Sequence, residues 1–123
     1  MAKVVDLPTV SMDFYPTILD YTNMPMKPEQ HLDGISLKPL LEDKTDTTHS
    51  IIIWDFPHYH GSGWTPGRAL RKGPWKVVYF FEEDYYELYQ IEQDPEEKID
   101  LANQELAKLE ELKKLLSNWA EQI

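Results

Sequence analysis

The stretch GRALRKGPWKVVYFFEEDYYELYQI, residues 67–91, decides the fold. Two turn signals interrupt it, the dipeptide Gly73-Pro74 and the acidic cluster 82–84. The three runs that they separate are expected to be strands, because they are short and the later two are rich in aromatic and β-branched residues. In the last run, alternation places Tyr86 and Leu88 on the same face. Short connections between consecutive strands favour an antiparallel sheet.

The segments on either side complete the expected fold. Upstream, IIIWDF at residues 51–56 is a β-branched run that ends at a proline, which predicts one more strand. Downstream, residues 102–121 predict a long amphipathic helix, since apolar side chains recur there every three or four positions. The stripe consists of Ala102, Leu106, Leu109, Leu112, Leu116, Trp119 and Ile123. The expected class is α+β: a four-stranded antiparallel β-sheet over residues 50–91, packed against the C-terminal α-helix.

A short helix is also expected near the N-terminus, over residues 10–22. Ser11 is placed to act as its N-cap, and Asp13 falls in the first turn, where a carboxylate suits the helix dipole. An apolar stripe is available for packing at Val10, Phe14, Ile18 and Tyr21.

Composition narrows the functional classes. A chain of 123 residues predicts a single domain, residues 1–123. It contains no cysteine, which excludes a disulfide framework, a thiolate zinc site and a cysteine nucleophile. The net charge of -10 argues against nucleic acid as a partner. No apolar run approaches the roughly 18 residues of a membrane span, so no membrane partner is expected.

One segment departs from the acidic character of the chain. Between Phe56 and Phe81 there is no aspartate or glutamate, while arginine, lysine, histidine and aromatic residues are all present. The segment is therefore either a site for an anionic ligand or a hairpin in which cations happen to cluster.

Two histidines stand in this segment, at His58 and His60. In an extended chain, residues two apart face the same side, so both imidazoles can converge on one ligand. Two nitrogens do not make a metal site, and Asp55 is the nearest further ligand. Contacts to an anion or a sugar remain open beside the alternative of surface histidines without a ligand. No metal is expected.

Trp64 and Arg68 complete the candidate set. Trp64 lies in a glycine-rich loop with no periodic reason for burial, and can stack on a sugar ring or a neighbouring domain. Arg68 follows the loop, and its guanidinium fork matches a sulfate or a carboxylate. Burial or charge balance is expected of the related residues: Trp54 and Trp75 in the core, and Arg71, Lys72 and Lys76 opposite the acidic segment EEDYYE or a neighbouring acidic surface.

No complete reaction centre assembles from these residues, but four segments appear in an order that resembles a known family. They are DFYPTILDYTNMP, LDGISLKPLLED, PGRALRKGPWKVVYF and YELYQIEQDPEEKIDLA, within residues 13–101. Together they resemble the C-terminal end of type I, arylsulfatase-like sulfatases. The matching positions are Asp13, Pro16, Thr17, Asp33, Gly34, Ser36, Leu37, Arg71, Trp75, Lys76, Glu87, Leu88, Tyr89, Asp94, Pro95, Glu97 and Leu101. Asp100 stands where the family usually has Asn, and FPHYHG resembles the version in sulfatases that act on polysaccharides.

The resemblance implies that the catalytic groups of the family lie in another domain. In this family a formylglycine, formed from the first residue of a Cys/Ser-x-Pro-x-Arg motif, attacks sulfur, and a calcium ion binds the sulfate. Both belong to an N-terminal catalytic domain, and this chain carries no such motif. The resemblance therefore implies a C-terminal subdomain with no catalytic residue and no cofactor of its own. Its partners would be that catalytic domain and a sulfated glycan substrate. Sulfatases of this kind are commonly exported or lysosomal.

Three readings remain open. In the first, residues 10–22 are the last helix of the catalytic part, and His58, His60, Trp64 and Arg68 contact substrate within a sulfatase. In the second, the chain is a free-standing module that binds acidic glycans. In the third, it is a structural module whose exposed apolar surface, with Phe14 and Ile18, docks on a partner domain.

Overall fold

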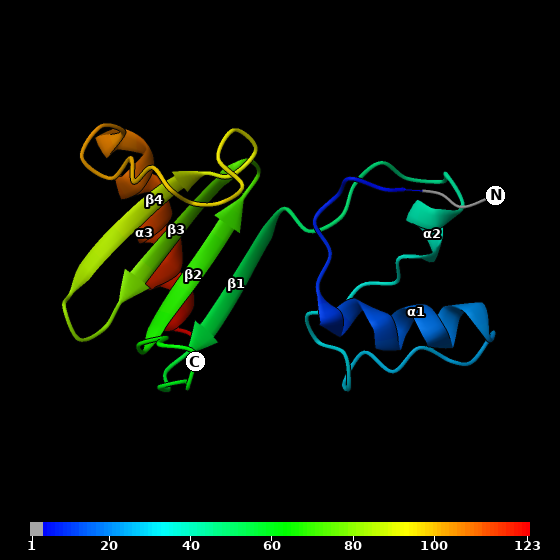
Figure 1. Ribbon diagram of the computed structural model, residues 1–123. Coiled ribbons are helices and arrows are strands. Elements are labelled where there is room, and N and C mark those ends of the chain that lie inside the picture. The colour runs from blue at the N-terminus through cyan, green and yellow to red at the C-terminus, as the bar shows by residue number, and fades with distance from the viewer. Residues whose placement is uncertain (1–3) are drawn as a thin grey trace. The chain divides into compact units, whose positions relative to one another are not determined.

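The computed structural model describes residues 4–123 (Figure 1), so the first three residues of the expected domain 1–123 lie outside the described part. The chain divides into two compact units, Met1–Ser50 and Ile51–Ile123, and each is described here by itself.

The second unit is built on a four-stranded antiparallel sheet in the order β1-β2-β3-β4. A C-terminal helix packs on one face of this sheet (Figure 1). The elements are β1 (Ile51–Phe56), β2 (Gly67–Lys72), β3 (Trp75–Phe80), β4 (Tyr85–Gln90) and α3 (Leu106–Ala120). This confirms the predicted α+β class.

The register of the β2–β3 hairpin distributes the side chains between the two faces. Lys72 lies opposite Trp75 across the turn, which places Leu70 opposite Val77 and Arg71 opposite Lys76. Because side chains alternate along a strand, Leu70 and Val77 face α3, and the two cations face the other side. We call that other side the open face. It carries Ile52, Trp54, Phe56, Ala69, Arg71, Lys76, Val78, Phe80, Glu87 and Tyr89.

The main core lies between the sheet and α3. Leu70, Val77 and Leu88 form a row across three strands, and all three are fully buried. Leu112 and Leu116 of α3 pack on this row and are also buried. Each such side chain contributes roughly 1.5–3 kcal/mol relative to an exposed position, so this interface stabilises the second unit.

The predicted boundaries of the C-terminal helix are wrong at the start. The helix begins at Leu106 rather than at residue 102, and Leu106 itself is 62% exposed. Ala102 is buried, as the stripe predicts, but it lies in the turn that precedes the helix. Ile123, the last member of the predicted stripe, is 77% exposed beyond the helix end.

Asp100 explains the late start. Its Oδ1 accepts hydrogen bonds from the Leu88 N–H at 3.0 Å and the Ala102 N–H at 2.9 Å. In addition, the Leu101 N–H donates to the Leu88 carbonyl at 2.8 Å. These bonds fix the segment along the edge of β4. They pair the N–H and carbonyl groups of Leu88, which would otherwise be left without partners at an open sheet edge.

The first unit contains a 3₁₀ turn (Ser11–Asp13), α1 (Phe14–Tyr21) and α2 (Lys38–Leu41). The helix expected over residues 10–22 is present, but its apolar stripe does not pack within the first unit. Phe14 and Ile18 are 64% and 60% exposed. The buried residues of this segment are Asp13, Pro16 and Leu19. The N-cap is also Val10 rather than the predicted Ser11, which is the first residue of the 3₁₀ turn.

The buried carboxylate of Asp13 sets this orientation. Its Oδ2 accepts from the Val10 N–H at 2.9 Å, and its Oδ1 accepts from the Ile35 N–H at 3.0 Å. Nε2 of His49 lies 2.8 Å from the same Oδ1. Burial raises the pKa of Asp13, but the hydrogen bonds from Ile35, Val10 and His49 outweigh it and hold the pKa below the ordinary value of 3.8. Asp13 therefore joins three separate segments of the first unit.

The substitution Asp13→Asn is expected to destabilise the first unit by about 2–4 kcal/mol, because an amide supplies one acceptor oxygen where three donors converge. Since the folded pKa lies below the unfolded one, the wild-type contribution is complete above pH 3.8 and is lost as the pH falls through the folded pKa. Hydrogen exchange of the Ile35 amide, followed against pH, measures both effects.

The control is Asp46→Asn, which removes the same charge from an exposed position in the same unit. It is expected to leave the exchange of the Ile35 amide unchanged. Equal protection of that amide in wild type and Asp13→Asn would contradict the role given to Asp13.

Candidate functional site

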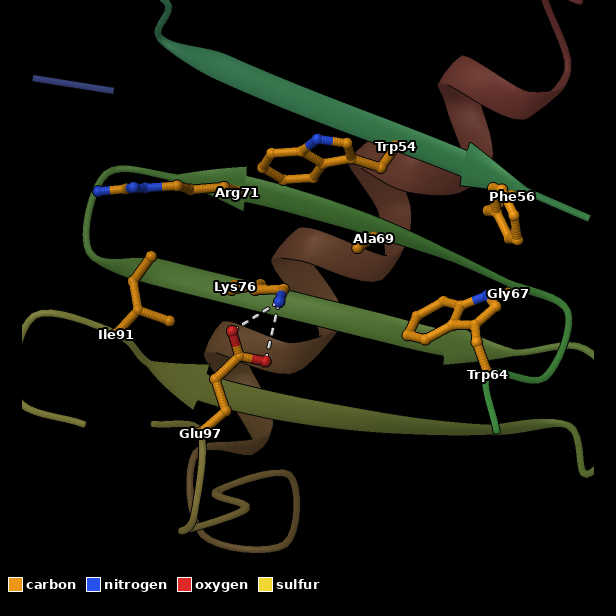
Figure 2. A pocket seen from close by; sticks show the side chains of 9 residues that line it. All are labelled: Trp54, Phe56, Trp64, Gly67, Ala69, Arg71, Lys76, Ile91 and Glu97. Carbon is orange, nitrogen blue, oxygen red and sulfur yellow. Dashed lines mark hydrogen bonds and ion pairs between the residues drawn. The ribbon is translucent and has the colours of Figure 1, made fainter. Parts of the chain in front are cut away.

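The open face of the sheet holds a pocket of about 380 Å³. Figure 2 shows Phe56 and Trp64 at one end of it and Arg71 and Ile91 at the other. The pocket therefore has an aromatic end and a charged end. Its full lining is Trp54, Phe56, Trp64, Gly67, Ala69, Arg71, Lys76, Ile91 and Glu97.

The aromatic end depends on the absence of a side chain at Gly67. A Cβ atom at this position would lie 2.8 Å from the Tyr79 carbonyl oxygen and 3.5 Å from Cζ2 of Trp64. The Trp64 ring can thus lie close to the start of β2, with its centroid 6.5 Å from that of Phe56 and 6.0 Å from that of Phe80. Phe56 and Trp64 of this cluster form one wall of the pocket.

The charged end combines two cations and one carboxylate. Nζ of Lys76 donates to both carboxylate oxygens of Glu97, at 2.6 and 2.8 Å (Figure 2). Glu97 has a positive φ of 53°, a conformation that is uncommon outside glycine. Arg71 donates through Nε to the Gly73 carbonyl at 3.1 Å, and it has no carboxylate partner among the described residues. One positive charge therefore stays in excess in the pocket.

Tyr89 lies beside this end of the open face, opposite Lys76 in the β3–β4 register. Its hydroxyl donates to Oε2 of Glu87 at 2.7 Å. Burial, followed by the hydrogen bond and the negative charge of Glu87, raises the pKa of Tyr89 well above its ordinary value. The phenol therefore stays neutral and does not oppose an anion near Arg71.

The β1–β2 loop, residues 57–66, brings three of the four predicted site residues around one ring. The centroid of Phe56 lies 5.8 Å from that of His58, 6.4 Å from that of His60 and 6.5 Å from that of Trp64. A β-bridge joins His60 to Trp64. Nδ1 of His60 lies 2.8 Å from Oγ of Ser62. The two imidazoles thus stand next to the aromatic end of the pocket.

Arg68 does not join these residues. In the register it is opposite Asp55 and Tyr79, on the face that α3 covers. Its Nε donates to Oδ1 of Asp55 at 2.8 Å, and its guanidinium carbon lies 5.2 Å from the ring centroid of Trp119 in α3. Arg68 therefore links the end of β1 to the helix.

Two expectations about neighbouring residues need correction. Trp54, which was expected in the core, is 43% exposed and lines the pocket, because its strand position faces away from α3. Of the three cations expected to balance EEDYYE or a neighbouring acidic surface, Lys72 and Lys76 pair with Glu111 and Glu97. Arg71, in contrast, has no carboxylate partner among the described residues. Trp75, in contrast, packs against the core as expected.

The sequence reasoning missed Phe56, Arg71 and Ile91 as pocket residues. A signal for Arg71 was present in the two-residue Gly73-Pro74 turn, because such a turn pairs residue 72 with residue 75 and hence Arg71 with Lys76. Alternation then places both cations on one face. Ile91 and Glu97 carry no comparable signal, since they lie outside the strands.

The described residues, 4–123, contain no group of three or more histidine, cysteine, aspartate or glutamate side chains placed to hold a metal ion. Over the same range, none of the helices has the length and apolar character that a membrane span requires.

Comparison with known proteins gives a family match over nearly the whole chain. Residues 2–122 match the family described as N-sulphoglucosamine sulphohydrolase, C-terminal. A Delta 4,5-hexuronate-2-O-sulfatase of Bacteroides thetaiotaomicron is 30% identical over 93 residues, which are 75% of this chain and 19% of that protein.

Solved structures agree with this match. A 2-O GAG sulfatase is 27% identical, with a TM-score of 0.75, and the alignment covers 89% of this chain and 24% of that one. A protein solved with its substrate D-glucosamine-2-N,6-O-disulfate is 26% identical, with a TM-score of 0.73, over 89% of this chain and 23% of that one. This chain thus spans about a fifth to a quarter of the length of these relatives.

The substitution Gly67→Ala is expected to displace Trp64 or bend β2, and to lower the free energy of unfolding of the second unit by about 1–3 kcal/mol. The added methyl group would meet the Tyr79 backbone oxygen, which cannot rotate away. Urea unfolding followed by tryptophan fluorescence measures the change.

Gly61→Ala is the matched control. A Cβ at Gly61 meets nothing within 4 Å, and its φ is not positive, so its unfolding curve is expected to overlay that of the wild type. If both substitutions have the same effect, the close packing of Trp64 on Gly67 does not matter for stability.

Proposed function

Because this chain belongs to the N-sulphoglucosamine sulphohydrolase C-terminal family and is a sulfatase C-terminal domain, we propose that it works within a sulfatase that acts on sulfated glycans. In this proposal the domain supports the catalytic part and lines the substrate site with the β1–β2 loop. The chain covers only a minor part of its relatives' length, so the activity of a longer protein is inferred from the family and from the chemistry of this loop.

The observation that carries the proposal is the convergence of His58, His60 and Trp64 on Phe56. Imidazole N–H groups donate hydrogen bonds to sulfate oxygens, and an indole ring offers a flat apolar surface to a pyranose. No carboxylate occurs between Phe56 and Phe81. A carboxylate close to a sulfate would cost roughly a kcal/mol in wet surroundings. Glu82, which follows this segment, does reach the loop, where its carboxylate accepts a hydrogen bond from the Tyr59 hydroxyl.

Arg68 is proposed to act on the loop from the opposite face. It holds Asp55 at the end of β1 and stacks on Trp119, and Asp55 is adjacent to Phe56. Its contribution would be to fix the strand from which the loop departs. Direct contact of Arg68 with the glycan, expected from the sequence, has no support from this geometry.

The chemistry of sulfate ester cleavage is proposed to reside outside this chain. The chain has no cysteine, and its described carboxylates form no cluster that fits a calcium ion. Calcium and formylglycine, which the family resemblance implies, do not fit the residues present here. They would belong to an N-terminal catalytic domain that is the partner of this one.

The exposed apolar side of α1 is a candidate contact for that partner. Phe14, Ile18 and Tyr21 are each between 46% and 64% exposed and follow one another on one side of the helix. Such a surface is unfavourable in contact with water. This supports the proposal that residues 10–22 belong to the last helix of the catalytic part.

The proposal predicts that the 123-residue chain alone binds a sulfated sugar weakly and releases no sulfate. The probes are D-glucosamine-2-N,6-O-disulfate and the neutral N-acetyl-D-glucosamine, titrated while the imidazole Cε1–H signals of His58 and His60 are followed by NMR. Shifts are expected with the disulfate, with a dissociation constant of about a millimolar. The double substitution His58→Ala, His60→Ala is expected to abolish them.

Equal shifts with both sugars would show that the loop does not recognise sulfate. Hydrolysis of an aryl sulfate by the purified chain, persisting after controls for contaminating enzyme, would contradict the assignment of catalysis to another domain. A dissociation constant in the micromolar range or below would instead favour a self-sufficient glycan-binding module.

A further inference from the structure

We propose that the charged end of the open-face pocket binds a pyranose unit that carries one anionic group, and that Arg71 is the residue that binds this group. The site is separate from the contacts made by His58 and His60 on the loop. This inference deepens the proposed function and rests on it for the source of the ligand, a sulfated glycan.

The size and lining of the pocket suit one or two sugar rings. Its volume of about 380 Å³ lies at the lower end of the range of small-molecule sites, about 300–1,000 Å³. Figure 2 shows the side chain of Trp54 on one side, with Ala69 in the floor and Ile91 on the far side. Trp54 is 43% exposed although it is the largest side chain on β1. An indole in this position offers a stacking surface to the apolar face of a pyranose.

Arg71 supplies the anion-binding group. Only its Nε has a partner among the described residues, the Gly73 carbonyl. This bond orients the guanidinium and leaves its two terminal nitrogens available. Their parallel N–H groups match the paired oxygens of a carboxylate or a sulfate. The Arg71 guanidinium is thus oriented, and its terminal nitrogens have no protein partner among the described residues.

Glu97 limits the site to a single negative charge. It neutralises Lys76 through two hydrogen bonds, so that Arg71 alone carries the excess charge. The positive φ of Glu97 indicates that its neighbours hold this conformation at a cost in backbone energy. A free Lys76 would favour dianions, whereas the paired form favours a monoanionic ring.

The experiment is an NMR titration of the 123-residue chain with D-glucuronate, D-glucosamine 6-sulfate and D-glucose. The signals followed are the Nε–H of Arg71 and the δ-methyl of Ile91. Both anionic sugars are expected to shift them, with dissociation constants of about a millimolar, and glucose is expected to bind at least about tenfold more weakly. A shift with only one of the two identifies a carboxylate or a sulfate as the ligand.

Three variants test the role of Arg71. Arg71→Gln is expected to weaken binding by about tenfold or more, and Arg71→Lys, which keeps the charge but not the fork, by less. Lys72→Gln is the matched control: it removes the same charge one residue along β2 but on the face that α3 covers, where Lys72 pairs with Glu111. Its binding is expected to stay within about twofold of wild type.

The outcomes separate this inference from the proposed function. If the loop histidines respond to the disulfate but the Arg71 and Ile91 signals respond to no anionic sugar, the inference fails and the proposed function stands. If Arg71 responds to glucuronate while the histidines ignore sulfate, the pocket stands and the loop assignment fails. Equal binding of glucose and glucuronate, or equal losses in Arg71→Gln and Lys72→Gln, would overturn the role of Arg71.

Discussion

The hydrogen-bond register of β2 against β3 is the constraint on which the second unit depends. It pairs Leu70 with Val77 and Arg71 with Lys76, which places an apolar row under α3 and two cations on the open face. A shift of one residue would exchange these sets and bury both charges against leucines. Desolvating an unpaired charge is far more costly than any gain from alternative packing, so the core and the pocket are specified together.

Contacts on the helix side of the sheet hold the strands that line the pocket on the open face. Arg68 lies partly buried between Asp55 and the ring of Trp119, at the strand end where the β1–β2 loop begins. On the same side, Glu111 of α3 forms an ion pair with Lys72 of β2. Hydrogen bonds from Lys108 and Lys72 lower the pKa of Glu111 to about 2. Both interactions hold strand positions that alternate with those lining the pocket.

Much of this fold was predictable from local patterns, and the errors have non-local causes. The strands and α3 follow from periodicity and turn residues. The start of α3 was missed because Asp100 bonds to Leu88 twelve residues earlier. The orientation of α1 was missed because Asp13 bonds to Ile35 and His49. His58, His60 and Trp64 lie within one short acid-free segment, which is why their proximity could be expected, and their role as site residues stays a prediction. The exposure of Trp54 could not be expected, because it depends on which face α3 covers.

The division of each strand between two faces has a consequence for how this domain can diversify. Residues 54, 71 and 76 line the pocket, while residues 53, 70 and 77 between or beside them build the core. Substitutions in the first set change the size and charge of the pocket without creating cavities in the core. The lining of the pocket can therefore change on a constant scaffold, one strand position at a time.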